Sequence, residues 1–418
     1  MKKTRRPVFA NFASLAAIQG VNLLAPLLTL PYLARVVGFE GFGILATAAA
    51  TCAWFGILID WGFNLTATRS VSTRRDDLEE VRRIFSAVTM AKLALIVLSF
   101  VVLTGLTFAV PSVRQYYLAY LFSFTFVASQ ALFPAWTFQG LERMAPVAVI
   151  NAVGKLVSTA LVLLLVNQPD EFARIPLINT IVSLGSVVVA MHRLHAKFGI
   201  SFVRPAVAQV LAMLKDGRQI FVATAAGNIY SQGSVLILNL FTDVASIGKY
   251  SIAQKISVAA VSVFGSLSQA YFPHISRLWV EAPERFMILV RRYVGATQLV
   301  SAVLLGTLFV FAPIVYPLLT GSHDAQGIAA IRYWLVVAQL TVLSVMLNPA
   351  LVSIGLDRSM ARMYIACGVA FLAYSCVLTK LFLLQGMLTS MVIVETTIAI
   401  ASLASFMRGA KVRALGSK

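Results

Sequence analysis

Residues 84–109 read IFSAVTMAKLALIVLSFVVLTGLTFA, a long apolar run that contains one charged side chain, Lys92. An α-helix needs about 20 apolar residues to cross the hydrocarbon core of a bilayer, so this stretch predicts a transmembrane helix. Lipid leaves only helices and closed barrels as spanning elements. The run does not alternate between apolar and polar residues as a barrel strand would, so a helix is favoured.

Similar runs fill the rest of the chain. Of its 418 residues, 59% are hydrophobic and 12% are charged, and the mean hydropathy is +0.85. A soluble domain carries about a quarter charged residues. We therefore predict an all-α membrane protein with about twelve transmembrane helices. The expected spans are 9–34, 42–62, 84–109, 115–138, 145–166, 174–192, 219–241, 248–272, 293–317, 331–353, 363–384 and 387–407.

Basic residues are distributed unequally between the two sides of these spans. Of 34 lysines and arginines, 25 fall on the side that holds both termini. Five fall on the other side, namely Arg35, Arg114, Arg174, Lys249 and Arg332. The positive-inside rule then predicts a multi-pass inner-membrane protein with both termini in the cytoplasm. Since the net charge of +18 is spread over short loops, nucleic acid is not an expected partner.

Several other functional classes are disfavoured. The three cysteines, Cys52, Cys367 and Cys376, lie in apolar runs without CxxC spacing, so neither a disulfide scaffold nor a metal site is expected. The chain has no GxxxxGK[ST] loop, so ATP is not the expected energy source, and no cofactor is expected. No A-x-A-like cleavage site follows the basic residues 2–6, so the first span should be a retained helix.

A short pattern recurs after 215 residues. Residues 134–143 contain Pro-Ala, four further residues and Gly-Leu-Glu-Arg, and residues 349–358 contain Pro-Ala, four residues and Gly-Leu-Asp-Arg. Each copy is expected to close one span and open the next at the cytoplasmic face. Halves of six spans insert in the same orientation, so the repeats should be parallel and related by a pseudo-twofold axis. Parallel repeats build transporters that alternate access around a site between two lobes.

This repeat divides the chain into an N-terminal lobe at 1–195 and a C-terminal lobe at 219–407, followed by a cytoplasmic tail at 408–418. Residues 196–218 are the expected linker. Five apolar residues in it recur at i, i+4, i+7, i+8 and i+11: Val203, Val207, Val210, Leu211 and Leu214. Such a pattern predicts an amphipathic helix on the cytoplasmic membrane surface.

Three stretches carry a resemblance to a known family. QGVNLLAPLLTLPYLARVVGFEGFG at 19–43, DWGFNLTATR at 60–69 and GKYSIAQKI at 248–256 resemble bacterial O-antigen and polysaccharide flippases. These are Wzx-type proteins of the multidrug/oligosaccharidyl-lipid/polysaccharide exporter superfamily. The resemblance implies two six-helix lobes around a cationic cavity lined mainly by helices 1, 2, 7 and 8. It also implies transport of undecaprenyl-diphosphate-linked oligosaccharide. Gln254 departs from the pattern, since relatives often carry an acid there.

Buried cations are the candidate substrate contacts. Lys92 and Lys155 are expected near mid-membrane, and Lys255 several residues inside the eighth span. A charge at the centre of a helix costs about 2.5–3.5 kcal/mol, so such residues normally face the protein interior or a water-filled cavity. Lysine offers a point charge that suits a moving diphosphate. Lys155 and Lys255 match alanines in the other half, so charge is not part of the repeated framework.

Other polar groups leave two interpretations open. Arg35 is consistent with a contact in the cavity or with a snorkelling position near the end of its span. Asp60 and Arg69 are consistent with contacts in the cavity or with a local structural pair between the two. Asn22 and Gln19 suit glycan contacts or hydrogen bonds between helices. Glu395, the only acid deep in a span, suits proton or sodium coupling or a structural pair with a buried lysine.

The resulting prediction is a flippase and not an enzyme. It would move undecaprenyl-diphosphate-linked O-antigen or other polysaccharide repeat units from the cytoplasmic to the periplasmic leaflet by alternating access. The bilayer and the polysaccharide polymerase machinery are the other expected partners. The alternatives are a multidrug-type exporter of small molecules and, ranked third, a membrane polysaccharide polymerase. The polymerase would need a large outer loop, and every expected outer loop is short.

Overall fold

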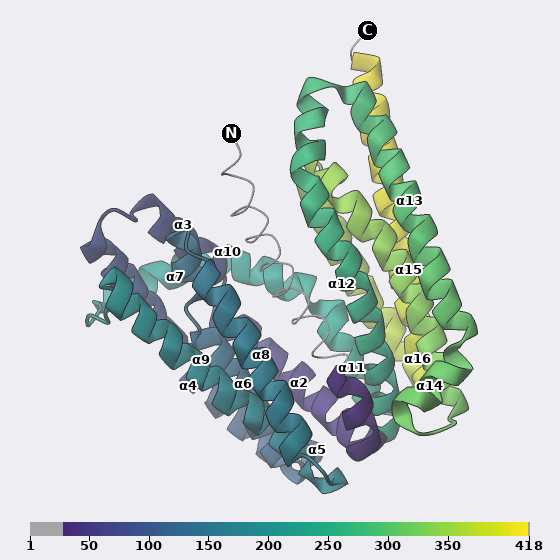
Figure 1. Ribbon diagram of the computed structural model, residues 1–418, viewed down its shortest axis with the longest axis horizontal. Helices are drawn as coiled ribbons and strands as arrows, with labels where there is room; N and C mark the ends of the chain where they lie inside the picture. Colours follow the sequence, from purple (N-terminus) through teal and green to yellow (C-terminus); the bar gives the residue numbers. More distant parts are fainter. Residues whose placement is uncertain (1–27, 417–418) are drawn as a thin grey trace, which may run out of the picture. The chain divides into compact units, whose positions relative to one another are not determined.

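The computed structural model describes residues 28–416 and divides them into two compact units (Figure 1). Unit 1 contains the described residues up to Val37 together with Ile44–Ala225, and unit 2 contains Gly38–Gly43 and the chain from Ala226 onward. The described residues form helices and connecting turns without β-strands. Most of the expected first span, 9–34, lies outside the described residues, although residues 28–36 are helical.

Unit 1 is built from helices α2 to α10, and α2 starts in the short Gly38–Gly43 segment of unit 2. The helices are α2 (Gly38–Asp60), α3 (Phe63–Thr73), α4 (Leu78–Ala109), α5 (Pro111–Gln115), α6 (Tyr117–Leu132), α7 (Ala135–Gly140), α8 (Ala145–Leu165), the 3₁₀ turn η1 (Pro169–Ala173), α9 (Arg174–Phe198) and α10 (Val207–Gly227). Helix α9 packs against both α6 and α8, and α3 packs against α7. Helix α4 packs against both α3 and α6 and so joins these helices into one bundle.

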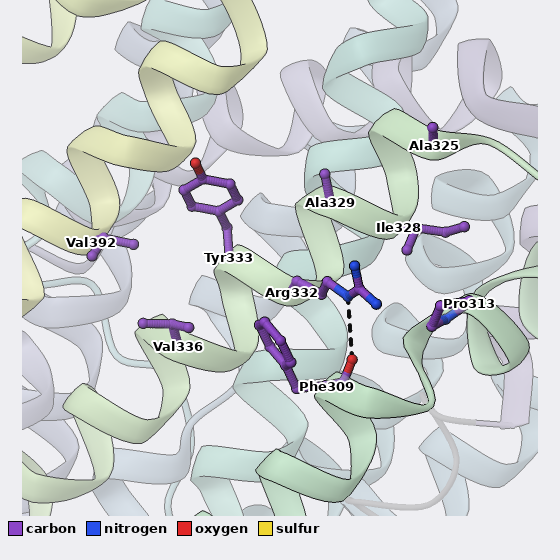
Figure 2. Close-up of a pocket in the computed structure, with 9 residues that line it drawn as sticks. All are labelled: Phe309, Pro313, Ala325, Ile328, Ala329, Arg332, Tyr333, Val336 and Val392. Atoms are coloured by element: carbon purple, nitrogen blue, oxygen red, sulfur yellow. Dashed lines mark hydrogen bonds between the residues drawn. The ribbon is translucent and has the colours of Figure 1, made fainter.

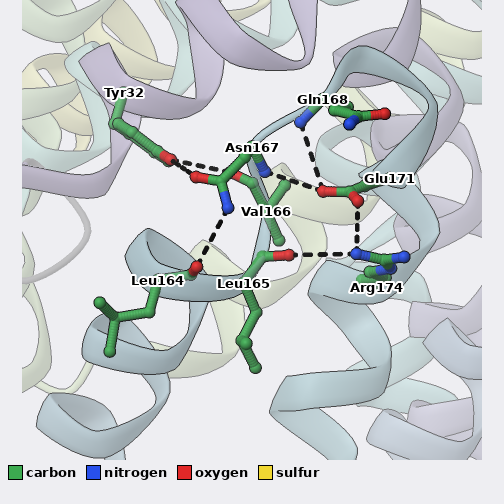
Figure 3. A network of polar contacts seen from close by, with 8 residues as sticks. All are labelled: Tyr32, Leu164, Leu165, Val166, Asn167, Gln168, Glu171 and Arg174. Atoms are coloured by element: carbon green, nitrogen blue, oxygen red, sulfur yellow. Dashed lines mark hydrogen bonds and ion pairs between the residues drawn. The ribbon is translucent and has the colours of Figure 1, made fainter.

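The helical residues 28–36 are tied to the turn between α8 and α9 by apolar and polar contacts. Val37 packs with Val162 and Val166 in a buried cluster. The Tyr32 hydroxyl donates to the Val166 carbonyl oxygen at 2.8 Å and to the Asn167 Oδ1 atom at 3.0 Å (Figure 3). Glu171 completes the network by accepting from the Asn167 amide at 2.8 Å and from the Arg174 guanidinium. Arg174, one of the five basic residues predicted for the outer side, is therefore a structural partner.

Helix α10 is held against the break between α2 and α3. Trp61 and Gly62 have positive φ angles of 46° and 81°, which end α2 and redirect the chain. The Trp61 indole donates to the Leu214 carbonyl oxygen at 2.7 Å and stacks on Phe221 with ring centroids 4.4 Å apart. A Cβ atom at Gly217 would lie 2.4 Å from the Trp61 carbonyl oxygen. Glycine at 217 therefore permits this close approach.

Unit 2 contains the remaining helices, and they are long. They are α11 (Ile229–Phe241), α12 (Val244–Glu281), α13 (Pro283–Val310), α14 (Ala312–Thr320), α15 (Ala325–Ser353) and α16 (Asp357–Gly416). Helix α15 packs against α12, α13 and α16, which run alongside it in green and yellow in Figure 1. Phe286, Leu347 and Phe406 are buried in the core where α13, α15 and α16 meet.

The first turn of α2 crosses the first turn of α12 inside unit 2. A Cβ atom at Gly43 would lie 1.9 Å from the Val244 carbonyl oxygen, and one at Gly248 would lie 1.9 Å from the Phe39 carbonyl oxygen. No larger residue could occupy either position without moving a backbone. The two glycines therefore permit direct backbone contact, as small residues do where membrane helices pack closely.

The prediction of an all-α membrane protein is confirmed. Among the described residues, nine helices are long and apolar enough to cross a membrane, or ten if α10 and α11 form one bent span. Helix α16 departs from helical geometry at Leu383, where φ is 51°, and so it contains two expected spans, 363–384 and 387–407. The amphipathic segment expected at 203–218 is helical only from Val207, and its helix continues to Gly227.

Both copies of the repeated pattern form the same turn, displaced by two residues. In the first copy Glu142 has a φ of 57°, and the Arg143 amide donates to the Phe138 carbonyl oxygen at 2.8 Å. In the second copy Gly355 has a φ of 79°, and the Leu356 amide donates to the Leu351 carbonyl oxygen at 3.0 Å. The matching turns are therefore 213 residues apart, whereas the sequence pattern recurs after 215.

Candidate functional site

Lys155 lies at the centre of α8 on a stripe of polar residues. It is ten residues beyond Ala145, or about 15 Å along a helix that is about 31 Å long. Its side chain is exposed and has no hydrogen bond or ion pair with the described part of the chain. Asn151 and Ser158 lie on the same face at i−4 and i+3, and the Ser158 hydroxyl hydrogen-bonds to Asn179 of α9. Unit 1 therefore has an exposed cation at the centre of α8, with polar residues on the same helical face.

Lys255 is an exposed cation on a polar helical face of unit 2. It is eleven residues beyond the first residue of α12, about 17 Å along the helix axis, and its side chain is exposed. Exposed polar residues follow it on the same helical face at i+7, i+11 and i+14, namely Ser262, Ser266 and Gln269. Each unit therefore contains an exposed cation within a long apolar helix, at the centre of α8 and about a third of the way along α12, with polar residues along the same face.

Lys92 and Asp60 are brought together in the interior of unit 1. The Lys92 side chain is 3% exposed, and its Nζ atom lies 3.5 Å from the Asp60 Oδ1 atom. The same ammonium group donates to the Ala131 carbonyl oxygen at 2.8 Å. Asp60 ends α2, and its carboxylate also accepts from the backbone amides of Gly62 and Asn64 at the start of α3. The pair thus links α4 to the break between α2 and α3, so the partner of Asp60 is Lys92 and not Arg69, the local partner considered from the sequence.

Glu395 is buried in unit 2 among neutral hydrogen-bonding groups. Its side chain on α16 is 4% exposed, and its hydrogen-bonding partners are the hydroxyls of Tyr230 on α11 and Thr341 on α15. Close by, the Tyr364 hydroxyl donates to the Asn348 Oδ1 atom at 3.4 Å. No lysine or arginine pairs with Glu395 in the described part of the protein. The carboxylate therefore has two hydrogen-bonding partners but no cationic partner among the described residues.

The remaining candidates take part neither in the Lys92–Asp60 pair nor in the hydrogen bonds of Glu395. Arg35 and Arg69 both have exposed side chains, and Arg69 forms no ion pair with Asp60. Asn22 and Gln19 lie outside the described residues. Sequence analysis missed the polar neighbours of Lys155, although Asn151 and Ser158 could have been found from their i, i+4, i+7 spacing with the lysine.

Comparisons with known proteins agree with this architecture. Two proteins named "Putative O-antigen transporter" are similar in sequence. The one from Escherichia coli (strain K12) is 31% identical over 291 residues, which is 70% of each chain. The one from Shigella dysenteriae is 24% identical over 93% of this chain and 98% of its own.

Solved transporters share the fold. The lipid II flippase MurJ in an inward closed conformation superposes with a TM-score of 0.72 at 10% identity, covering 95% of this chain and 90% of its own. A multidrug resistance MATE family transporter of the MOP superfamily, in an inward-facing conformation, gives 0.67 at 15% identity, covering 92% and 98%. At these identities the similarity concerns the fold alone.

Residues 8–279, which are well over half of the chain, match the family described as "Polysaccharide biosynthesis protein". The matched stretch contains the N-terminal and central helices that carry Asp60, Lys92, Lys155 and Lys255. The chain belongs to the polysaccharide biosynthesis protein family.

Proposed function

We propose that this protein is a flippase for undecaprenyl-diphosphate-linked oligosaccharides, the repeat units of O-antigen or another surface polysaccharide. It moves them from the cytoplasmic to the periplasmic leaflet of the bacterial inner membrane. Family membership, the names of the two relatives and the transporter fold support a role in polysaccharide transport. The orientation with both termini in the cytoplasm is inferred from the distribution of basic residues.

The observation that carries the proposal is the exposed, unpaired Lys155 at the centre of α8. A cation facing lipid at this depth costs about 2.5–3.5 kcal/mol, whereas one facing a water-filled cavity avoids that cost. In this proposal Lys155 and Lys255 each face a polar, water-filled space, where their ammonium groups attract the diphosphate. The sugars contact polar groups such as Asn151 and Ser158 while the polyprenyl chain stays in lipid. Alternating access then exposes the head group to the periplasm.

Lys92 has a different role in this proposal. Its ammonium group is already bound by Asp60 and the Ala131 carbonyl oxygen, so it has little capacity left for a phosphate. We assign it to holding the helices of unit 1 together. A small-molecule exporter that takes cationic drugs is the alternative function, and the two exposed lysines of α8 and α12 disfavour it, because they repel cations. The peripheral candidates Arg35, Asn22, Gln19 and Arg69 remain proposed cavity contacts.

Deleting the gene tests the proposed function directly. We expect undecaprenyl-diphosphate-linked repeat units to accumulate on the cytoplasmic side, because synthesis continues while export stops. Mass spectrometry of extracted lipids, combined with labelling of the sugars that are exposed in the periplasm, would measure the amount and its side. Intact synthesis without accumulation would contradict the proposal, and altered drug resistance in its place would favour the exporter.

We further propose that Glu395 couples transport to a proton or sodium gradient. We expect Glu395→Gln to lower export and to remove its response to an imposed gradient, because the amide cannot gain or lose a proton. Inverted membrane vesicles loaded with lipid-linked glycan would measure the response. Glu281→Gln is the matched control, since Glu281 is an exposed acid that pairs with Arg277 at the end of α12. Export by Glu395→Gln that still follows the gradient would exclude this coupling role.

A further inference from the structure

A cavity of about 590 Å³ lies between α13, α14, α15 and α16 of unit 2 (Figure 2). Its walls are mainly apolar and include Phe309, Ile328 and Val336, and the one charged residue in the lining is Arg332. Two of its apolar lining residues are exposed, Phe309 by 38% and Val336 by 40%. The cavity therefore opens onto an apolar surface of the kind that contacts acyl chains.

Arg332 is bound to the wall by part of its guanidinium group. Its Nε atom donates to the Phe309 carbonyl oxygen at 3.3 Å, and its guanidinium carbon lies 5.3 Å from the centre of the Phe309 ring. Figure 2 shows the guanidinium group pointing toward Pro313 and Ile328, among the residues that line the cavity. Its two terminal nitrogens contact no acceptor in the described part of the chain. These nitrogens remain available for a ligand.

No acid nearby neutralises Arg332. Asp324 begins α15 only eight residues earlier, but its carboxylate accepts from Lys249 Nζ at 2.9 Å and from the Gly327 amide at 2.8 Å. Arg332 forms no ion pair with any described residue. Arg332 lies seven residues beyond Ala325, the first residue of α15, which is about 10 Å along the helix axis. The cavity thus has a positive charge without a counter-ion in an apolar wall.

We infer that this cavity binds an anionic phospholipid of the outer leaflet, with its phosphate on Arg332 and an acyl chain along the apolar wall. A guanidinium binds phosphate through two parallel hydrogen bonds, which the free terminal nitrogens can supply. The volume falls within the usual range of ligand pockets, about 300–1,000 Å³. Free phosphate would leave the apolar wall unfilled. This inference does not depend on the cargo that the protein transports.

Lipid binding to the purified full-length protein tests the inference. The probe is phosphatidylglycerol added to delipidated protein in detergent, and native mass spectrometry counts the molecules bound per chain. We expect Arg332→Gln to weaken binding of one phosphatidylglycerol about tenfold or more, because both charge-assisted hydrogen bonds are lost. Arg332→Lys should bind with intermediate affinity, since an ammonium lacks the planar pair of donors.

Two further variants make the result decisive. Arg114→Gln is the matched control, because Arg114 is an exposed arginine on the same predicted side of the membrane and should leave binding unchanged. Val336→Trp fills the cavity without touching the charge and should also abolish binding, which decides the matter if Arg332→Gln fails to fold. Unchanged binding in folded Arg332→Gln or Val336→Trp protein would overturn the inference, as would displacement of the lipid by an equal concentration of inorganic phosphate.

Discussion

Replacing Lys155 with alanine is expected to lower export of the lipid-linked glycan by about tenfold to a hundredfold, while the protein inserts normally. The factor corresponds to the loss of one charge-assisted hydrogen bond, about 1.5–3 kcal/mol. The side chain is exposed and makes no hydrogen bond or ion pair with the described part of the chain, so its removal should leave the packing of α8 intact. Complementation of a deletion strain, with the accumulated lipid-linked glycan measured by mass spectrometry, gives the size of the effect.

Two variants separate a cavity role from a general effect of charge. Lys380→Ala removes another exposed lysine from a membrane helix, and it should export as the wild type does because Lys380 lies near the outer end of its expected span. Lys155→Arg keeps the charge and should retain most of the activity. Normal export by Lys155→Ala at wild-type protein levels would remove Lys155 from the proposed cavity.

The positions of the membrane helices could be predicted because the bilayer imposes one length on every apolar run. The expected span 145–166 corresponds to α8, and 331–353 lies within α15. The ends were less predictable, because helices continue into water wherever capping permits. Helix α4, for example, starts six residues before its expected span, where the Asp77 side chain accepts from the Glu80 amide at 3.1 Å.

Breaks within spans depend on local geometry that hydropathy does not encode. The expected span 115–138 is interrupted between α6 and α7, where Phe133 has an extended conformation before Pro134. The sequence revealed the repeat, but it did not reveal which residues of the two turns correspond. A Cβ atom at Gly140 would lie 2.7 Å from Val71, so this glycine permits close packing, whereas Gly355 supplies a positive φ angle. The same residue type therefore serves different purposes in the two copies.

The candidate site was predictable only in part, since the sequence reveals that a charge lies deep in a helix but not which neighbour it meets. Lys92 and Lys155 looked equivalent in the sequence. The structure separates them, because α4 faces the end of α2 at Asp60 whereas the α8 face that carries Lys155 is exposed. Partner choice depends on which helix faces pack together, and one sequence does not specify that packing.

Lys92 is expected to matter for stability more than for transport. Lys92→Ala leaves the Asp60 carboxylate without its cation in the interior of unit 1, where Lys92 is 3% and Asp60 27% exposed. Removing one partner of a buried ion pair costs about 3–5 kcal/mol, because the remaining charge is uncompensated. We therefore expect a much lower unfolding temperature in detergent and less protein in the membrane.

The double variant Asp60→Asn/Lys92→Met distinguishes a structural pair from a substrate contact. With both charges removed, the pair leaves no isolated charge, so stability should recover most of what Lys92→Ala loses. The side-chain oxygen that Asp60→Asn retains can still accept hydrogen bonds from the amides at the start of α3, which preserves the break between α2 and α3. If the pair is structural, the stable double variant should export glycan at near the wild-type rate. A double variant that is stable but does not export would instead place Lys92 among the residues that act on the substrate, because its charge would then be required for transport and not for folding.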